Sequence, residues 1–212
     1  MLTFRILSTL LSYPTPELKT QLPEAERILR SEGLLGRQQL DGVCAFLQYL
    51  RDTSQFDTES AYIDAFDRGR STSLYLFEHI HGDSRVRGQA MVKLLLRYRA
   101  HGLDPSTREL PDYLPLFLEF LSTRPPVEAG KHLAEVADIV ALIGERLRRR
   151  SAPHAPVLGA VASLAADRAA RVSTLESDGE DRDDTPAALD AAWEEAPVVF
   201  NDADGVPGAT TG

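Results

Sequence analysis

Apolar residues recur every three or four positions through most of this chain, and this spacing constrains its fold more than any other feature. Phe4, Leu7 and Leu11 show it near the start, and a longer stripe runs from Leu40 to Leu50. A repeat of 3.6 residues places such side chains on one face of a helix. Alternation with a period of two never persists, and the Asn-Gly and Gly-Gly turns of hairpins do not occur in the sequence. We therefore predict an all-α fold.

The interruptions of this pattern predict a bundle of roughly eight to ten helices around one core, in a single domain over residues 1–174. At 212 residues the chain is long enough for one domain with a substantial core. Asp57 and Asp83 are predicted N-caps. The segment 112–121 is apolar on nearly every side, so we expect it to form a central buried helix. The helices are expected near residues 4–11, 17–31, 37–50, 57–66, 74–79, 83–99, 112–121, 126–150 and 154–174.

The composition changes after residue 174, where Asp, Glu, Gly, Pro and Thr predominate. Residues 175–212 hold eleven acidic residues and one base, Arg182, so the rest of the chain is close to neutral although the net charge is -9. We predict that this segment is a largely disordered acidic tail. Its apolar island at 189–200 is expected to dock on its own domain or stay loose, or else to bind a partner or occlude the protein's own groove.

The charge balance and the absence of long apolar runs exclude several classes of protein. A nearly neutral folded part without a dominant basic face argues against nucleic-acid binding. The single cysteine, Cys44, excludes an intrachain disulfide, which fits a reducing compartment. No stretch approaches the roughly 18 apolar residues of a membrane-spanning helix, and the N-terminus lacks the features of a signal peptide. We therefore expect a soluble, cytoplasmic protein that does not insert into a membrane.

A compact charged corner, Asp67-Arg68-Gly69-Arg70, separates two apolar runs in the stretch 62–82. Two arginines between apolar helices are costly unless a partner or an internal carboxylate receives their charges. Glu78 and Glu119 lie in helices that are predicted to be apolar, and buried carboxylates commonly pair with arginine. Arg68 and Arg70 are therefore the expected partners of these two carboxylates.

No constellation for catalysis or metal binding accompanies this corner. The sequence lacks a Walker-type loop, a GxGxxG fingerprint and a GxSxG elbow. Ser71, Thr72 and Ser73 have no base at a suitable spacing, so we interpret them as N-cap donors at a helix start. His79 and His81 lack further metal ligands and are interpreted as helix-end residues that contact backbone or carboxylates. We therefore predict no catalytic residues and no metal site.

Residues 62–91, YIDAFDRGRSTSLYLFEHIHGDSRVRGQAM, resemble the signature of the NarJ/NarW-type nitrate reductase assembly chaperones. That family belongs to the TorD-like, all-helical chaperones of molybdenum enzymes. Residues 109–121, ELPDYLPLFLEFL, are similar to the superfamily pattern E-x-P-D-H-x-x-x-x-L-x-F-L, with Tyr113 where a histidine is common. FRILSTLLSYPTPEL at the start and ALDAAWEEAPVVF in the tail also resemble family segments, so the likeness covers most of the chain.

The resemblance implies a dedicated cytoplasmic chaperone and not an enzyme. Such proteins bind the apo catalytic (alpha) subunit of respiratory nitrate reductase, partly through its N-terminal segment, and the implied partner is this subunit within the alpha–beta complex. They keep it competent for insertion of bis-molybdopterin guanine dinucleotide (bis-MGD) before membrane docking, and they bind no cofactor permanently. The superfamily also contains domain-swapped dimers, so a homodimer is left open.

The residues expected to bind this client surround the charged corner. The apolar ones would line a groove for a client helix, although they equally suit a core. The charged ones would orient the client, or meet its charges or the phosphates of the cofactor, or instead form an internal ion-pair latch. The candidate residues are Tyr62, Phe66, Asp67, Arg68, Arg70, Leu74, Phe77, Glu78, His79, Asp112 and Glu119.

Two other functions stay open beside the chaperone. A structural or regulatory subunit of a redox complex would remain bound to the mature membrane enzyme. A cofactor-handling hydrolase would show turnover that depends on Glu78 or Glu119.

Overall fold

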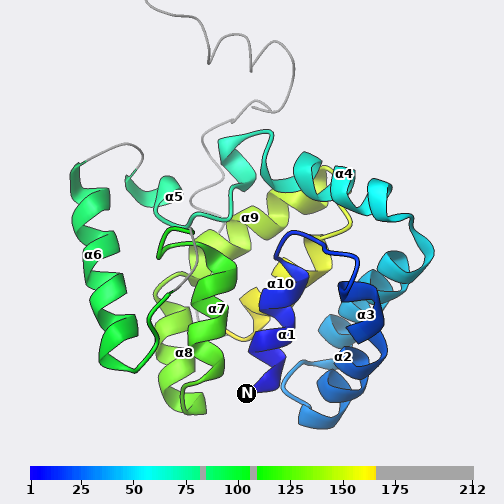
Figure 1. Ribbon diagram of the computed structural model, residues 1–212, viewed down its shortest axis with the longest axis horizontal. Helices are drawn as coiled ribbons and strands as arrows, with labels where there is room; N and C mark the ends of the chain where they lie inside the picture. The colour runs from blue at the N-terminus through cyan, green and yellow to red at the C-terminus, as the bar shows by residue number, and fades with distance from the viewer. Residues whose placement is uncertain (82–84, 106–108, 166–212) are drawn as a thin grey trace, which may run out of the picture.

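The computed structural model describes residues 1–81, 85–105 and 109–165, and the regular secondary structure in these ranges is helical (Figure 1). This confirms the predicted all-α fold. The predicted tail, the domain boundary at residue 174 and the Asp83 cap lie outside the described residues. The ten α-helices of the described part are α1 (Leu2–Leu10), α2 (Leu18–Glu32), α3 (Arg37–Asp52), α4 (Gln55–Phe66), α5 (Glu78–His81), α6 (Arg85–Ala100), α7 (Leu114–Ser122), α8 (Pro126–Ala134), α9 (Ala137–Arg149) and α10 (Ala155–Ser163), and a 3-10 turn, η1 (Arg70–Thr72), follows α4.

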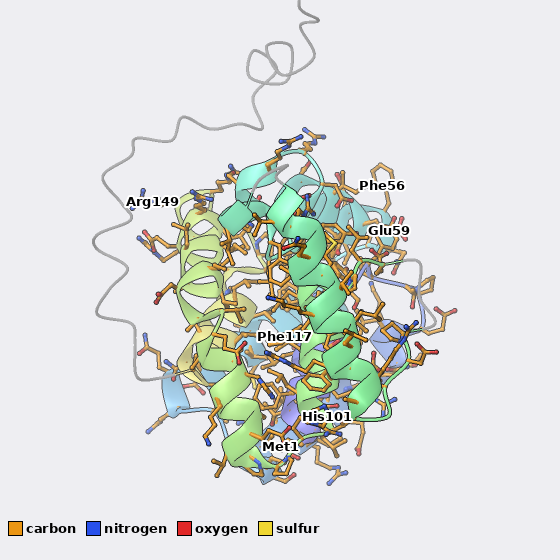
Figure 2. The ribbon with its side chains drawn as sticks, turned by 90° about the vertical axis from the view of Figure 1, so that its left-hand side faces the viewer. Met1, Phe56, Glu59, His101, Phe117 and Arg149 are labelled. Carbon is orange, nitrogen blue, oxygen red and sulfur yellow. The ribbon has the colours of Figure 1, made fainter. Side chains whose placement is uncertain are left out.

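Helices α1 and α7 lie side by side at the centre of the molecule (Figure 1). Leu7 of α1 and Leu118 of α7 are completely buried, and the ring of Phe117 points into the interior (Figure 2). The Ser8 hydroxyl donates a hydrogen bond of 2.6 Å to the carbonyl of Pro115, which satisfies a buried polar group between the two helices. The apolar segment 112–121 therefore forms the central buried helix that its composition predicts, although α7 begins at Leu114.

Helix α10 packs against both α3 and α9, and small residues allow the close approach. A Cβ atom added at Gly42 would lie 3.2 Å from Cβ of Pro156, and one at Gly144 would lie 3.2 Å from Cβ of Leu158. Across the bundle, α2 and α3 lie at one edge and α6 lies at the other (Figure 1). No helix among the described residues is long and apolar enough to cross a membrane.

The predicted bounds of the helices 126–150 and 154–174 are wrong. The predicted helix 126–150 is broken, because Val136 has φ -121° and ψ 7° and separates α8 from α9. Leu133 and Val140, on the two sides of the break, are both completely buried, so the apolar pattern continues across it. Helix α10 ends at Ser163, although the pattern predicted a longer helix.

The start of α4 also differs from the prediction. Ser54, and not Asp57, is the N-cap, and its hydroxyl accepts a hydrogen bond of 3.1 Å from the backbone N–H of Asp57. Asp57 lies in the first turn, where its negative charge interacts favourably with the positive end of the helix dipole. The two side chains also contact each other, since the hydroxyl of Ser54 lies 2.7 Å from a carboxylate oxygen of Asp57.

Candidate functional site

The charged corner lies where α4 ends, and two arginines at the end of α9 hold it. The guanidinium of Arg146 donates a hydrogen bond of 2.8 Å to the carbonyl of Ser71. Arg150 donates to the hydroxyls of Ser71 and Thr72 at 2.7 and 3.3 Å. The prediction that Ser71, Thr72 and Ser73 cap a following helix is wrong. The first two hydroxyls accept from Arg150 in η1, and the hydroxyl of Ser73 accepts from the backbone N–H of Tyr75, ahead of the start of α5 at Glu78. The basic residues that end α9 therefore fix the shape of the corner.

The two arginines of the corner itself are exposed. Arg68 forms an ion pair of 2.7 Å with Asp64, one turn earlier on α4, and both side chains are about half exposed. The prediction that Arg68 pairs with Glu78 or Glu119 is wrong: Glu78 contacts Arg87 at 3.2 Å, and Glu119 is exposed on α7. An ion pair this accessible to water adds little stability, so Arg68 can exchange its partner at low cost.

The predicted helix 74–79 is also wrong, because its first half pairs with the second motif segment. The backbone N–H of Leu114 donates a hydrogen bond of 2.8 Å to the carbonyl of Leu74, and the N–H of Leu76 donates one of 3.0 Å to the carbonyl of Asp112. Tyr75 and Tyr113 form an isolated antiparallel bridge. These long-range bonds replace helical ones, and only residues 78–81 form the short helix α5. The stretches 62–91 and 109–121 are thereby joined at one place.

Asp112 lies completely buried at this junction. One carboxylate oxygen accepts a hydrogen bond of 3.0 Å from the backbone N–H of Phe77 and lies 3.8 Å from the guanidinium of Arg87. The other oxygen has no hydrogen-bond partner among the described residues. Burial raises the pKa of this carboxyl above its ordinary value. His79 lies nearby, and its Nε2 is 2.9 Å from the carbonyl of Ser73, as a helix-end interpretation expects.

A cleft of about 200 Å³ opens between the end of α4 and the paired segments. Tyr62 and Tyr113 form its inner part, and their hydroxyl oxygens lie 3.0 Å apart. The ring of Tyr13 meets that of Tyr62 edge-on at 5.4 Å, and the ring of Tyr75 lies 5.3 Å from that of Tyr113. The described residues that line the cleft are Tyr13, Tyr62, Phe66, Asp67, Ser73, Leu74, Tyr75, Glu109 and Tyr113.

The cleft brings together some of the predicted site residues and separates others. Four of the predicted residues line it: Tyr62, Phe66, Asp67 and Leu74. Phe77 donates a backbone hydrogen bond to the neighbouring buried carboxylate of Asp112, Glu78 shares Arg87 with that carboxylate, and His79 contacts the carbonyl of Ser73. The two exposed arginines lie on the corner beside the cleft. Glu119, on α7, does not line the cleft.

Sequence reasoning did not select five of the described lining residues as site residues: Tyr13, Ser73, Tyr75, Glu109 and Tyr113. All five lie within the stretches that resemble the family, at 4–18, 62–91 and 109–121, so the motifs contained a usable signal. The aromatic residues were not selected because the contacts between them are long-range.

The charge of the cleft is negative. Asp67 and Glu109 are both exposed at its mouth, and the described lining residues include no basic side chain. Partial burial and the charge of Glu109 raise the pKa of Asp67. Burial, together with the hydrogen bond to Glu109, likewise raises the pKa of Tyr75, whose hydroxyl donates to that carboxylate. The cleft therefore favours a positively charged group over an anion.

An exposed apolar stripe on α4 leads to the cleft. Phe56 and Ile63 are 77% and 39% exposed, and their spacing with Glu59 and Asp67 places all four on one face of the helix. Phe56 and Glu59 project from the surface (Figure 2). Tyr13, 47% exposed, lies next to Tyr62 at the cleft end of this stripe. Phe56, Ile63 and Tyr13 are thus exposed apolar side chains on the same side of the structure as the cleft, and contiguous exposed apolar surface marks interaction sites.

Within the described residues no group of three or more His, Cys, Asp or Glu side chains is placed to hold a metal ion. The arrangement of rings, carboxylates and backbone bonds at the cleft is suited to binding a polypeptide.

Comparisons with known proteins identify the family. The model of the nitrate reductase delta subunit family matches residues 37–159. The nitrate reductase molybdenum cofactor assembly chaperone NarJ of Escherichia coli (strain K12) is 43% identical over 202 residues, which cover 94% of this chain and 85% of the relative. NarW of the same strain is 41% identical over 201 residues, covering 94% and 84%. NarJ of Bacillus subtilis (strain 168) is 32% identical over 158 residues, covering 74% and 84%. The chain therefore belongs to the nitrate reductase delta subunit family, together with NarJ and NarW.

Proposed function

We propose that this protein is a dedicated assembly chaperone of respiratory nitrate reductase. It binds the apo catalytic (alpha) subunit, within the alpha–beta complex, and keeps it competent for insertion of bis-MGD before the enzyme docks at the membrane. The name of the E. coli NarJ relative, a nitrate reductase molybdenum cofactor assembly chaperone, supports this role. The cofactor is cargo for the client, and the chaperone's own part is to hold the polypeptide.

The observation that carries the proposal is that the two family motifs meet at an exposed cleft. Leu74 and Leu114 join the motifs by a backbone hydrogen bond of 2.8 Å, and the cleft lies directly beside this bond. An amphipathic helix from the N-terminal segment of the client would lay its apolar side along Phe56 and Ile63 and reach the cleft at the end of α4. Exposed apolar side chains that become buried on binding would supply most of the affinity.

The exposed arginines of the corner would orient the bound client. Arg68 and Arg70 lie at the same end of α4 as the cleft. In this proposal Arg68 meets an acidic group of the client, because its surface ion pair with Asp64 can open at little cost. Replacing Arg68 by Gln is expected to weaken client binding and to leave the melting temperature within about 2 °C of wild type.

Calorimetric titration with the apo catalytic subunit, and with a peptide of its N-terminal segment, tests the proposal. The substitutions Phe56→Asp and Ile63→Asp should lower the affinity about tenfold or more, because each puts a charge into the buried interface. Val127→Asp is the matched control, since Val127 is 73% exposed on α8, away from α4 (Figure 1). Absence of any complex with the wild-type chain would overturn the proposal.

A purification experiment separates the chaperone from the remaining alternatives. The mature membrane-bound reductase should contain none of this protein after purification, because a chaperone leaves once the cofactor is in place. A stoichiometric amount in the mature enzyme would instead indicate a structural or regulatory subunit.

A further inference from the structure

We propose that the tyrosine-lined cleft binds one cationic side chain of the client, an arginine in preference to a lysine. This inference rests on the proposed chaperone function and adds to it which chemical group of the client the cleft recognises. The exposed apolar side chains of α4, Phe56 and Ile63, would set affinity, whereas the cleft would set the register of the bound segment.

The charge of the cleft favours a cation as its ligand. Asp67 and Glu109 are the ionisable carboxylates of the cleft, and no base among its described lining residues balances them. The pKa of Asp67 is raised by partial burial and by the negative charge of Glu109, so the two carboxylates repel each other across the cleft. A cation that enters between them removes this repulsion, whereas an anion or an apolar group would leave it in place.

The aromatic lining of the cleft also suits an organic cation. Four tyrosine rings, those of Tyr13, Tyr62, Tyr75 and Tyr113, surround a volume of about 200 Å³. The face of an aromatic ring carries a negative partial charge, and several rings around one site form the cage by which proteins bind organic cations. A cleft of this size can take the head group of one side chain but not a whole helix, which indicates a single residue as the ligand.

The fixed carboxylate of Glu109 favours arginine over lysine. The Tyr75 hydroxyl donates a hydrogen bond of 2.5 Å to one oxygen of Glu109, which holds that carboxylate in place at the mouth of the cleft. A planar guanidinium can bind a fixed carboxylate through two parallel hydrogen bonds and stack on a tyrosine ring at the same time. An ammonium group is a point charge with a strongly held water shell, so it gains less from the rings.

A double-mutant cycle between peptide and chaperone tests the inference. Each arginine of the client's N-terminal peptide is replaced in turn by citrulline, which keeps the shape and removes the charge. These peptides are titrated into the wild type, into Glu109→Gln and Asp67→Asn variants, and into an Asp41→Asn control. Asp41 is an exposed carboxylate on α3 that does not line the cleft.

We expect one position at which citrulline weakens binding to the wild type and to Asp41→Asn about tenfold, but binding to Glu109→Gln less than about threefold. Lysine at that position should bind more weakly than arginine. If the peptide binds the wild type well and every citrulline effect is the same in all four proteins, the inference about the cleft is wrong and the chaperone function stands.

A second measurement decides the question even if the client peptide does not bind. The chain has six tyrosines, of which four line the cleft, while Tyr49 and Tyr98 do not. With ¹³C-labelled tyrosine, N-acetyl-arginine amide should shift the signals of the four cleft tyrosines and leave the other two unchanged. N-acetyl-citrulline amide should shift none. Equal shifts with both compounds, or none with either, would overturn the cation site independently of the chaperone proposal.

Discussion

The carboxylate of Asp112 accepts a hydrogen bond of 3.0 Å from the backbone N–H of Phe77, across a separation of 35 residues. Together with the backbone pairing of Leu74 and Leu114, this bond joins the two motif segments beside the cleft. Asp112 is completely buried, and its second oxygen lacks a hydrogen-bond partner in the part of the chain that the structure describes. The junction is therefore maintained at a cost in desolvation, which makes its stability sensitive to both the acceptor and the charge.

Substitutions at Asp112 should separate these two contributions. Asp112→Ala removes the acceptor and leaves the N–H of Phe77 unsatisfied, so we expect a loss of about 2 kcal/mol in the free energy of unfolding. Asp112→Asn keeps an acceptor oxygen without the charge and should lose less. Urea unfolding at pH 7 measures both. Equal losses for the two variants would show that the hydrogen bond to Phe77 does not stabilise the junction.

The same carboxyl predicts a pH dependence. Its folded-state pKa is raised above the ordinary value of 3.8, so the folded protein binds the proton more tightly than the unfolded chain. This group therefore makes the protein less stable as the pH rises from about 3.8 through the raised value, and the effect is complete above it. As the pH rises over this range, the free energy of unfolding of the wild type should fall relative to that of Asp112→Asn.

The hydroxyl pair of Tyr62 and Tyr113 should stabilise the inner end of the cleft. Their oxygens lie 3.0 Å apart, and that of Tyr62 also lies 3.3 Å from the carbonyl of Leu11. Tyr62→Phe and Tyr113→Phe should each cost about 1 kcal/mol, and the double variant should cost less than the sum, because the two share one hydrogen bond. Additive losses in urea unfolding would mean that the two hydroxyls act independently.

Much of the fold could be predicted because it follows from local periodicity. The stripes that contain Leu7, Leu47 and Leu118 identify the buried faces of α1, α3 and α7, and all three side chains are completely buried. The apolar character of 112–121 is enough to place α7 at the centre. These features depend on neighbours three or four positions apart, which a single sequence displays directly.

The parts that could not be predicted depend on long-range contacts. Residues 74–77 have a helical apolar spacing, but pairing with residues 112–114 supplies their hydrogen bonds instead. Val136 interrupts a periodic stripe at a point where both flanking helices are buried, so the spacing gives no sign of the break. The cleft joins Tyr13, Tyr75 and Glu109 from three separate stretches, and only the fold brings them together.

His154 should make the protein less stable in mild acid. Its ring is buried among those of Phe46, Tyr62 and Phe66, at 4.8, 5.8 and 5.0 Å, and burial lowers its pKa from 6.5 to about 4. The unfolded chain therefore binds the proton more readily, and stability should fall as the pH decreases from about 6.5 to 4. The full effect on the free energy of unfolding is a loss of roughly 3 kcal/mol.

Urea unfolding between pH 4 and 7.5 measures this dependence. His154→Leu, which has a similar volume and no charge, should show a smaller decline than the wild type over the range 6.5 to 4. His101→Gln serves as a control, because the side chain of His101 is about one-third exposed, and the decline should persist in that variant. A decline of the same size in His154→Leu would assign the acid sensitivity to other groups.

The arginines at the end of α9 should control the shape of the corner and thereby the affinity for the client. Arg150 donates to the hydroxyls of Ser71 and Thr72, so Arg150→Met removes charge-assisted hydrogen bonds and should cost about 2 kcal/mol in unfolding free energy. Arg148→Met is the matched control, because Arg148 is 69% exposed and pairs with Glu145 on the surface of α9. That variant should lose less than about 1 kcal/mol in the free energy of unfolding.

Calorimetry with the client peptide should then show weaker binding to Arg150→Met and unchanged binding to Arg148→Met, since the cleft lies against the segment that Arg150 positions. If the two variants bind the peptide equally well, α9 stabilises the corner without shaping the binding surface.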